Sequence, residues 1–282
     1  MAFNWQTFKT RTLTAVIFAA VILTGLFWNQ WSFFILFSVI HFGCWVEYLK
    51  LVEQIDKRYQ QISWVHKYSI MIAGWCILLY FASDTYNIFG LLLYKTGQWA
   101  ILVLLLVAVF SELSHVKNIR HSLFGLLYIS LSWGLMMNLY RKRDVPGHDM
   151  VYIINDYLIP IAIIASIWIN DTMAYVVGSL IGKTQLSKIS PKKTWEGTIG
   201  GIILSVAVIG LISFYGFHFG SLTFHFIIIA AISSIAGTFG DLLESKLKRM
   251  AGVKDSGHIM PGHGGFLDRF DSMLLAIPAV WL

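Results

Sequence analysis

Long apolar runs alternate with short polar stretches along almost the whole chain. The runs lie at residues 12–29, 31–49, 68–83, 98–114, 121–140, 157–181, 197–217 and 222–240. Each is close to the roughly 20 apolar residues that a helix needs to cross a bilayer. A last run, 272–282, is too short to cross unless its helix begins earlier, near Phe266. The pattern predicts an all-α polytopic integral membrane protein with about nine transmembrane helices.

The positions of lysine and arginine predict how these helices are oriented. If the N-terminus is cytoplasmic, the inside segments carry 17 of the 21 Lys and Arg residues; these segments are 1–11, 50–67, 115–120, 182–196 and 241–271. Cytoplasmic loops of membrane proteins are enriched in these two residue types. The distribution therefore predicts a cytoplasmic N-terminus and puts the most polar segments on the cytoplasmic side. We divide the chain into an N-terminal transmembrane region, 1–120, and a C-terminal one, 121–282, within one integral unit.

Composition supports this interpretation and narrows the possible partners. Hydrophobic residues make up 57% of the chain and charged residues 13%, about half the charged share of a soluble domain. The net charge of +6 would suggest nucleic acid for a soluble protein. In a membrane protein it favours anionic lipid and phosphate-bearing substrates, with no nucleic acid. Cys44 and Cys76 lie inside apolar runs, so no disulfide framework is expected.

The most polar block runs from residue 240 to 271, GDLLESKLKRMAGVKDSGHIMPGHGGFLDRFD. Asp268 and Asp271 are three residues apart and would share one helix face, and Asp241 and Asp255 could join them if the loop folds back. Mg²⁺ commonly binds one or two carboxylates together with substrate phosphates. The cations of the block are Lys246, Lys248, Arg249, Lys254 and Arg269. Mixed charges in a loop are usually a solvated surface, but their density here favours a site for a metal-bridged phosphate.

Three glycines in this block predict a tight turn. Gly262, Gly264 and Gly265 allow close approach of the backbone, with N–H groups available to an anion. A helix beginning after Gly265 would add a favourable N-terminus for a phosphate.

A second polar block occupies residues 168–201. Asp171 follows Asn170 inside an apparent span, where an ionisable group usually marks a functional site and otherwise pairs with a basic neighbour. The segment SPKKTWEG then suggests a helix with Ser190 as cap, Pro191 in the first position and Glu196 in the early turns. Lys192 and Lys193 either bind phosphate or only follow the charge bias of cytoplasmic loops; their spacing does not decide between these.

Other polar residues carry weaker signals. Glu47, near the end of the second run, is interpreted as structural and paired with a loop lysine. Only two histidines, His258 and His263, lie among the dense charges. The cysteines and histidines match no zinc pattern, and neither a Walker motif nor a GxSxG elbow is present.

The two blocks together resemble the phosphatidate cytidylyltransferase (CDP-diacylglycerol synthase) family. The C-terminal signature of that family is matched by Ser245, Leu247, Lys248, Arg249, Lys254, Asp255, His263, Gly264, Gly265, Asp268, Arg269 and Asp271. The upstream segment from NDTMAYVVGSLIGK to SPKKTWEG is similar to a second block of the same family. The resemblance covers about 65 residues, and the N-terminal half agrees only in its hydropathy and spacing.

The resemblance implies transfer of the cytidylyl group of CTP to phosphatidate, giving CDP-diacylglycerol and pyrophosphate with Mg²⁺ as cofactor. For this reaction we expect metal binding by Asp241, Asp268 and Asp271, with Asp255 as a further candidate. Catalytic roles are expected for the same three aspartates, Asp241, Asp268 and Asp271. They are also expected for Lys248, Arg249 and Asp171. Substrate contacts are expected from Ser190, Lys192, Lys193, Lys254, His263, Gly264, Gly265 and Arg269. A second cation and a homodimer stay open, and the bacterial inner membrane is the expected location.

Phosphoryl chemistry explains why such a site lacks an obvious general base. The second pKa of a phosphate monoester is about 6, so the attacking oxygen is largely deprotonated near neutral pH. Metal and cationic side chains would stabilise the leaving pyrophosphate.

Two other functions compete with this reaction. A CTP-dependent lipid kinase, acting on a polyprenol-type alcohol, would transfer the γ-phosphate and release CDP. A phosphate or cation transporter could also bury Asp171, but it would more naturally hold its polar site at the bilayer midplane between internal repeats. No repeats are evident in the sequence.

Overall fold

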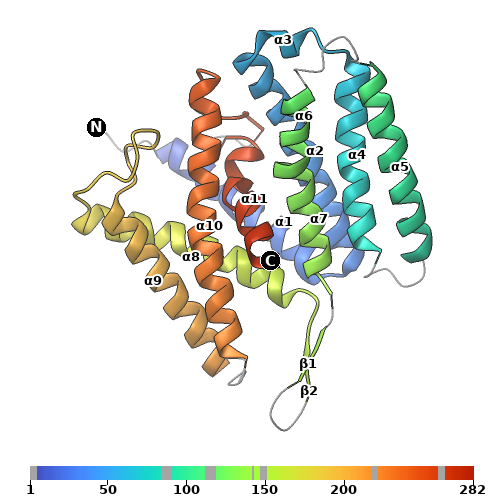
Figure 1. Cartoon of the computed structure of the whole chain (residues 1–282). Helices are drawn as coiled ribbons and strands as arrows, with labels where there is room; N and C mark the ends of the chain where they lie inside the picture. The colour runs from blue at the N-terminus through green and yellow to red at the C-terminus, as the bar shows by residue number, and fades with distance from the viewer. Residues whose placement is uncertain are drawn as a thin grey trace. The chain divides into compact units, whose positions relative to one another are not determined.

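The chain is described from a computed structural model covering residues 5–83, 90–111, 119–141, 143–146, 151–216, 222–259 and 264–282. Helices dominate it (Figure 1). The helices are α1 (Trp5–Phe27), α2 (Gln30–Ile55), α3 (Lys57–Gln60), α4 (Trp64–Ala82), α5 (Gly90–Ser111), α6 (Ile119–Gly125), η2 (Leu126–Ser130), α7 (Leu131–Leu139), α8 (Leu158–Ile181), α9 (Trp195–Leu211), η3 (Ile212–Gly216), α10 (Thr223–Met250) and α11 (Leu267–Trp281). One short antiparallel hairpin, β1 (Arg143–Pro146) with β2 (Val151–Ile154), departs from the predicted all-helical chain.

Every predicted apolar run falls on a helix in the described residues. Within the described residues, six helical segments are long and apolar enough to cross a membrane: 30–55, 64–82, 119–139, 158–181, 195–216 and 223–250. Thr12–Phe27 and Gln98–Ala108 are shorter apolar helices. The chain is therefore a multi-pass membrane protein, while the count of nine spans and the cytoplasmic N-terminus stay predictions. The helix of the last run does begin earlier, at Leu267.

The apolar run predicts a helix end at residue 240, but α10 continues ten residues further, to Met250. Basic residues in its last turn, Lys248 and Arg249, interact favourably with the carbonyl end of the helix. Gly252 then takes φ +72, and the amides of Gly252 and Val253 donate to the carbonyls of Arg249 and Lys248. This is a Schellman termination. Half of the polar block is thus helix and not loop.

The described contacts divide the chain into two compact units, described separately below. The first unit is Met1–Asn138 with Leu247–Phe270, and the second is Leu139–Lys246 with Asp271–Leu282. These units are defined by contacts between residues. The regions 1–120 and 121–282 were instead defined by where the polar motifs lie in the sequence. That earlier division stays a prediction.

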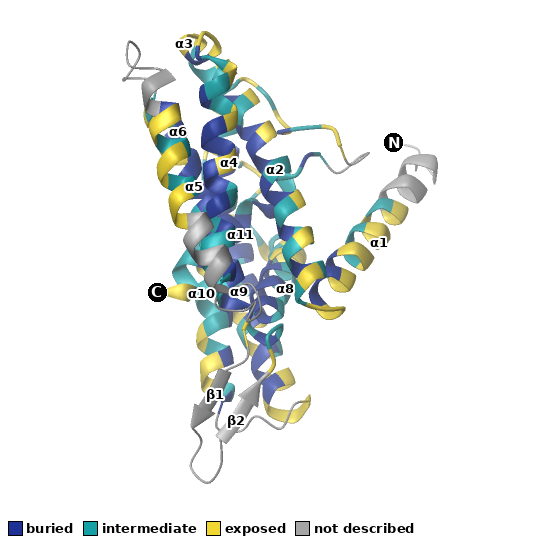
Figure 2. Cartoon of the chain, turned by 90° about the vertical axis from the view of Figure 1, so that its right-hand side faces the viewer, coloured by how far each residue is buried: buried dark blue, intermediate teal, exposed yellow. Residues whose placement is uncertain are grey.

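In the first unit, α2 supplies much of the buried core. Its buried aromatic residues include Phe37 and Trp45, and Trp133 of α7 stacks near the Phe37 ring. Helix α1 packs on α2, and α4 lies beside α5; Figure 2 shows exposed residues along α1. Buried hydroxyls also link the helices, since the Trp45 indole donates to Ser130 Oγ at 2.8 Å. Such hydrogen bonds stabilise helix pairs within membranes.

In the second unit, α8 and α9 pack closely along a stripe of small residues. A side-chain carbon at Gly201 would lie 2.7 Å from the carbonyl oxygen of Asn170 and 2.8 Å from the Ala174 methyl. Gly197, one turn earlier, similarly faces the Ala174 carbonyl and Gly178. Small residues four apart are a common means of close helix packing in membranes. The stripe holds α9 against the turn of α8 that carries Asn170 and Asp171.

Replacing Gly201 by alanine should therefore destabilise the α8–α9 pair. Overpacking a tight contact costs about 1–3 kcal/mol, although alanine is otherwise the better helix former by about 1 kcal/mol. Gly216→Ala is the matched control, because a carbon there makes only an ordinary contact at 3.8 Å. Thermal unfolding in detergent should show a lower Tm for Gly201→Ala than for Gly216→Ala. Equal Tm values would contradict the packing described here.

Candidate functional site

Asp268, in the first turn of α11, has a carboxylate that is fully engaged by neighbouring groups of the first unit. Its Oδ1 atom accepts from the Lys248 ammonium at 2.7 Å. Its Oδ2 atom accepts from the amides of Gly265 at 2.8 Å and Ser256 at 2.9 Å, and lies 3.0 Å from the Ser256 hydroxyl. The side chains of Lys248 and Asp268 are only 12% and 7% exposed. The ion pair is thus largely shielded from water.

The surroundings of Asp268 also decide its charge. Burial alone would raise the pKa of this carboxyl, but the hydrogen bonds from the Gly265 amide and the Lys248 ammonium outweigh burial and hold the pKa below its ordinary value. Asp268 is therefore ionised at neutral pH and keeps Lys248 oriented.

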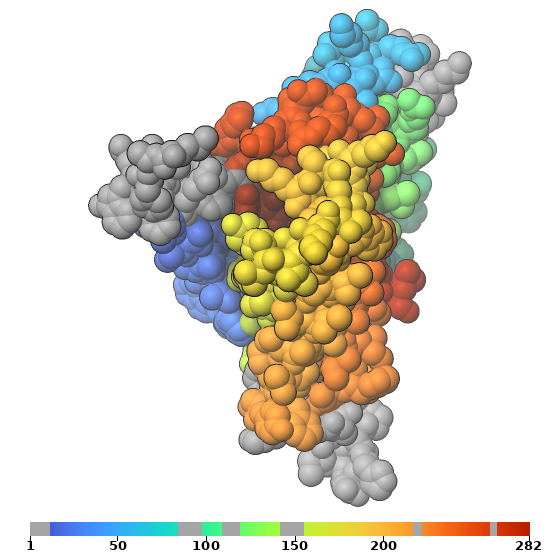
Figure 3. Space-filling model, turned by 90° about the vertical axis from the view of Figure 1, so that its left-hand side faces the viewer, coloured from blue at the N-terminus to red at the C-terminus, as the bar shows by residue number. Residues whose placement is uncertain are grey.

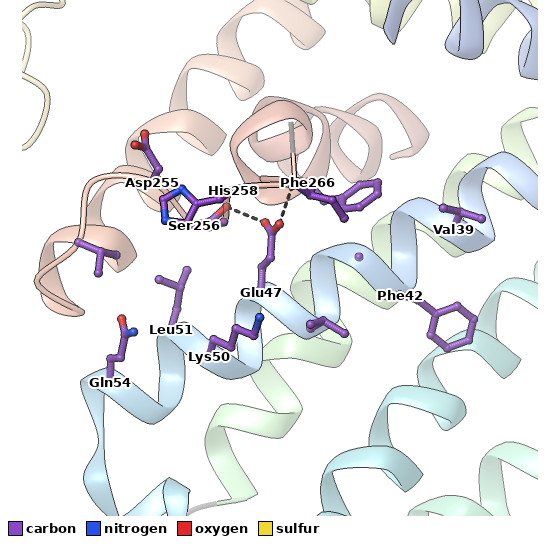
Figure 4. A pocket seen from close by; sticks show the side chains of 15 residues that line it. Val39, Phe42, Glu47, Lys50, Leu51, Gln54, Asp255, Ser256, His258 and Phe266 are labelled. Atoms are coloured by element: carbon purple, nitrogen blue, oxygen red, sulfur yellow. Dashed lines mark hydrogen bonds between the residues drawn. The ribbon is translucent and has the colours of Figure 1, made fainter. Parts of the chain in front are cut away.

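A second carboxylate, Glu47 of α2, meets the same turn of chain (Figure 4). Glu47 Oε1 accepts from the Phe266 amide at 2.9 Å. Oε2 accepts from the Leu267 amide at 2.9 Å and from the Ser256 hydroxyl at 2.7 Å. The predicted lysine partner of Glu47 is therefore wrong, since these backbone and hydroxyl donors take its place. Donors that converge from the chain itself satisfy the buried charge more compactly than a long side chain would.

At the N-terminus of α11, backbone amides donate to carboxylates of the chain itself, while binding of a phosphate there stays a prediction. Gly264 adopts φ +82, a conformation that favours glycine, and the next three amides, of Gly265, Phe266 and Leu267, point to carboxylates. These carboxylates belong to Asp268 and Glu47. Contact of Gly264 and Gly265 with substrate stays a prediction, and His263 and Gly262 lie outside the described residues.

In the second unit, Lys193 and Asp241 form an ion pair beside Asp171. The Asp171 and Asp241 carboxyls are close enough to repel one another electrostatically, and Lys193 attracts both. These side chains line a cavity of about 470 Å³. Its other lining residues include Asn170, Ser190, Lys192, Thr194, Thr198 and Thr238. Acidic, cationic and hydroxyl groups thus meet in a space large enough for a phosphate-bearing ligand.

The loop from Gly182 to Thr194 reaches this cavity in a form that differs from the predicted one. The N-cap of α9 is Thr194, which accepts from the Gly197 amide at 3.2 Å. Ser190 instead begins a turn, closed by the Lys193 amide, so its predicted capping role is wrong. Glu196 does lie in the first turn, where it accepts from the amides of Lys183 and Thr184. Figure 3 shows this loop and α9 (yellow to light orange) at the surface.

The remaining candidate residues are held by local contacts. Arg249 is exposed and donates to the Val253 carbonyl at 2.8 Å. Ser245 donates to Asp241 at 3.2 Å, and Asp271 Oδ1 accepts from the Ser272 amide. The backbone of Asp271 lies directly against Gly240, the residue before Asp241. Lys254 and Asp255 are exposed, and Arg269 is half-buried.

A second, more apolar cavity of about 760 Å³ lies in the first unit (Figure 4). One wall is α2, with Val39, Phe42, Val46, Glu47 and Lys50, and the other is the segment from Val253 to Ile259 with Phe266. Glu47 is thus reached both from this cavity and from α11.

The fit of a metal ion differs between the two clusters. The described residues contain no group of three or more His, Cys, Asp or Glu side chains placed to hold a metal. Mg²⁺, however, often uses only one or two carboxylates together with substrate phosphates. Asp171 and Asp241 fit that donor set, because both carboxylates line the same cavity and the side chain of Asp241 is 25% exposed. Asp268 fits less well, since its side chain is only 7% exposed and lines neither cavity.

The sequence did not indicate a role for Ser256 or Thr194, and Glu47 was interpreted only as structural. Ser256 lies between the two carboxylates of the first unit, and nothing in its sequence context marks it. Glu47 did carry a signal, because an acidic residue inside an apolar run is costly unless it is satisfied or functional.

Comparisons with known proteins place these clusters in a family. The model of the cytidylyltransferase family matches residues 9–282. A protein of Staphylococcus saprophyticus named phosphatidate cytidylyltransferase is 41% identical over 157 residues, which are 55% of each chain. Proteins of the same name from Staphylococcus haemolyticus and Staphylococcus aureus are each 40% identical over 157 residues and the same 55% shares. The matched stretch spans about half the length of these curated relatives. As the resemblance of its two polar blocks predicts, the chain belongs to the cytidylyltransferase family.

Proposed function

We propose that the chain is a phosphatidate cytidylyltransferase, which converts CTP and phosphatidate into CDP-diacylglycerol and pyrophosphate. The observation that carries the proposal is the cluster around Asp268. There, two residues of the family signature, Lys248 and Asp268, form an ion pair that is largely shielded from water. The relatives' names and the family match support the substrate class. A lipid substrate also suits a multi-pass membrane protein.

In the proposed reaction, an oxygen of the phosphatidate phosphate attacks the α-phosphorus of CTP. A new phosphorus–oxygen bond forms, and the bond from the α-phosphorus to the oxygen bridging to the β-phosphorus breaks, releasing pyrophosphate with its electron pair. The attacking oxygen is largely deprotonated near neutral pH, because the second pKa of a phosphate monoester is about 6. No general base is needed, so the task of the protein is to hold anions together.

The two clusters suit different parts of that task. Lys193, with Lys192 beside it in the lining of the second-unit cavity, would bind phosphate oxygens of CTP. Asp241 and Asp171, together with Asp271, whose backbone lies against Gly240, would hold Mg²⁺, which supplies charge stabilisation to the polyphosphate. Lys248, oriented by Asp268, would stabilise negative charge on the transferred or leaving phosphate. Arg249, Lys254 and Arg269 are further phosphate ligands in this proposal, and the reaction would take place at the cytoplasmic face of a bacterial inner membrane.

Position-specific labels of CTP test the proposed reaction directly. With phosphatidate and Mg²⁺, label in the α-phosphate should enter the lipid fraction, and label in the γ-phosphate should be released as pyrophosphate. A CTP-dependent lipid kinase would give the reverse, with the γ-label in lipid and the α-label in CDP. That second pattern, or no lipid label from either position, would contradict the proposal.

Substitution of Lys193 tests the polar cavity. Lys193→Met should lower kcat/KM for CTP about ten- to a hundredfold, since a charge-assisted hydrogen bond contributes about 1.5–3 kcal/mol. Lys188→Met is the matched control, because Lys188 is an exposed lysine of the same loop that does not line the cavity. The control should stay within about twofold of the unsubstituted protein. Equal losses in both variants would mean that only the general charge of the loop matters.

A further inference from the structure

Glu47 is unusual because it is a buried acidic residue in α2, a helix long and apolar enough to cross a membrane. The residue is 6% exposed, and both of its oxygens accept hydrogen bonds. All three donors belong to the segment from Ser256 to Leu267. A buried carboxylate is costly unless hydrogen-bond donors surround it. Its presence here calls for a reason beyond packing.

Two glycines of this segment, Gly257 and Gly265, lie directly against the Glu47 side chain. A side-chain carbon at either Gly257 or Gly265 would collide with the Glu47 carboxylate. One turn earlier on α2, a carbon at Gly43 would collide with the ring of Phe266. Gly43 and Glu47 thus form a face of α2 that packs closely against this segment. Figure 4 shows Glu47 beside Ser256 and Phe266.

Ser256 connects Glu47 to the ion pair of the signature. Its hydroxyl oxygen is 2.7 Å from Glu47 Oε2 and 3.0 Å from Asp268 Oδ2, and its single proton serves these two acceptors. Its amide donates to the same Asp268 oxygen at 2.9 Å, and Asp268 in turn holds Lys248 at 2.7 Å. A continuous chain of hydrogen bonds thus runs from α2 to Lys248 within the first unit.

We propose that Glu47 is a positioning residue for the proposed cytidylyl transfer. Through Ser256 and the Phe266 and Leu267 amides, it fixes the start of α11, so that the Asp268 carboxylate faces Lys248. The inference rests on the proposed function for its catalytic consequence. The geometry itself does not depend on which reaction the protein catalyses.

Glu47→Gln tests the proposal with little change in shape. Glutamine keeps one acceptor oxygen and replaces the other by an NH₂ group, which in either orientation faces a backbone N–H of Phe266 or Leu267. The expected result is a loss in kcat of about ten- to a hundredfold per folded molecule, with KM for CTP within about threefold. Hydrogen exchange at the Phe266 and Leu267 amides should become faster.

The matched control is Glu53→Gln, the same chemical change on the same helix. Glu53 pairs with Lys67 at 3.0 Å and is 34% exposed, so this variant also loses an ion pair but does not touch the signature segment. Its kcat and the exchange of the two amides should be unchanged. If Glu47→Gln behaves like the control, or loses activity only in proportion to its folded fraction, the positioning role is wrong.

A double substitution separates positioning from independent effects. If Glu47 acts through Lys248, the Glu47→Gln/Lys248→Met variant should lose little more activity than Lys248→Met alone. Fully additive losses would overturn the proposed route. If the unsubstituted protein transfers no cytidylyl group, the proposed function fails, whereas faster amide exchange in Glu47→Gln would still establish the anchoring contact.

Discussion

Two carboxylates at the start of α11 set the constraint on which the rest of the signature depends. Asp268 and Glu47 are charged groups in an apolar protein, and such groups are tolerated only when donors surround them. The amides of Gly265, Phe266 and Leu267, the Ser256 hydroxyl and the Lys248 ammonium supply those donors. The described part of the segment from Ser256 to Asp268 therefore supplies most of the donors that these two carboxylates need.

This constraint separates two kinds of acidic residue in the chain. Asp268 has its oxygens committed to protein donors and serves to orient a lysine. Asp241 lies with Asp171 at a cavity in the second unit, where Lys193 provides the opposing charge. The second arrangement borders a cavity of about 470 Å³, which leaves room for a ligand.

Hydropathy predicted the helices well because bilayer-spanning segments must be continuous and apolar. It failed at the end of α10, since a helix can continue through charged residues that hydropathy counts as loop. The cap of α9 was also misplaced, because Ser190 and Thr194 are both acceptable caps and only tertiary contacts choose between them.

The sequence predicted which residue types make up the candidate site, but not which side chains contact one another. Dense Asp, Lys and Arg residues marked both clusters, whereas the partners of each carboxylate could not be read from spacing. Glu47 and Ser256 are separated by more than 200 positions along the chain, and local sequence rules carry no information on such a contact. The charge of Glu47 inside an apolar run was the one available signal, and a surface lysine was the simpler explanation for it.

Dependence of activity on Mg²⁺ concentration tests most directly whether the two kinds of acidic residue have different tasks. The measurement compares Asp241→Asn with Asp268→Asn, each assayed for lipid-linked cytidine over a range of Mg²⁺. If Asp241 holds the metal and Asp268 orients Lys248, Asp241→Asn should need at least about tenfold more Mg²⁺ for half-maximal rate, an energy near 1.4 kcal/mol. Asp268→Asn should lose maximal rate with an unchanged Mg²⁺ requirement. A raised Mg²⁺ requirement in Asp268→Asn and none in Asp241→Asn would contradict this division.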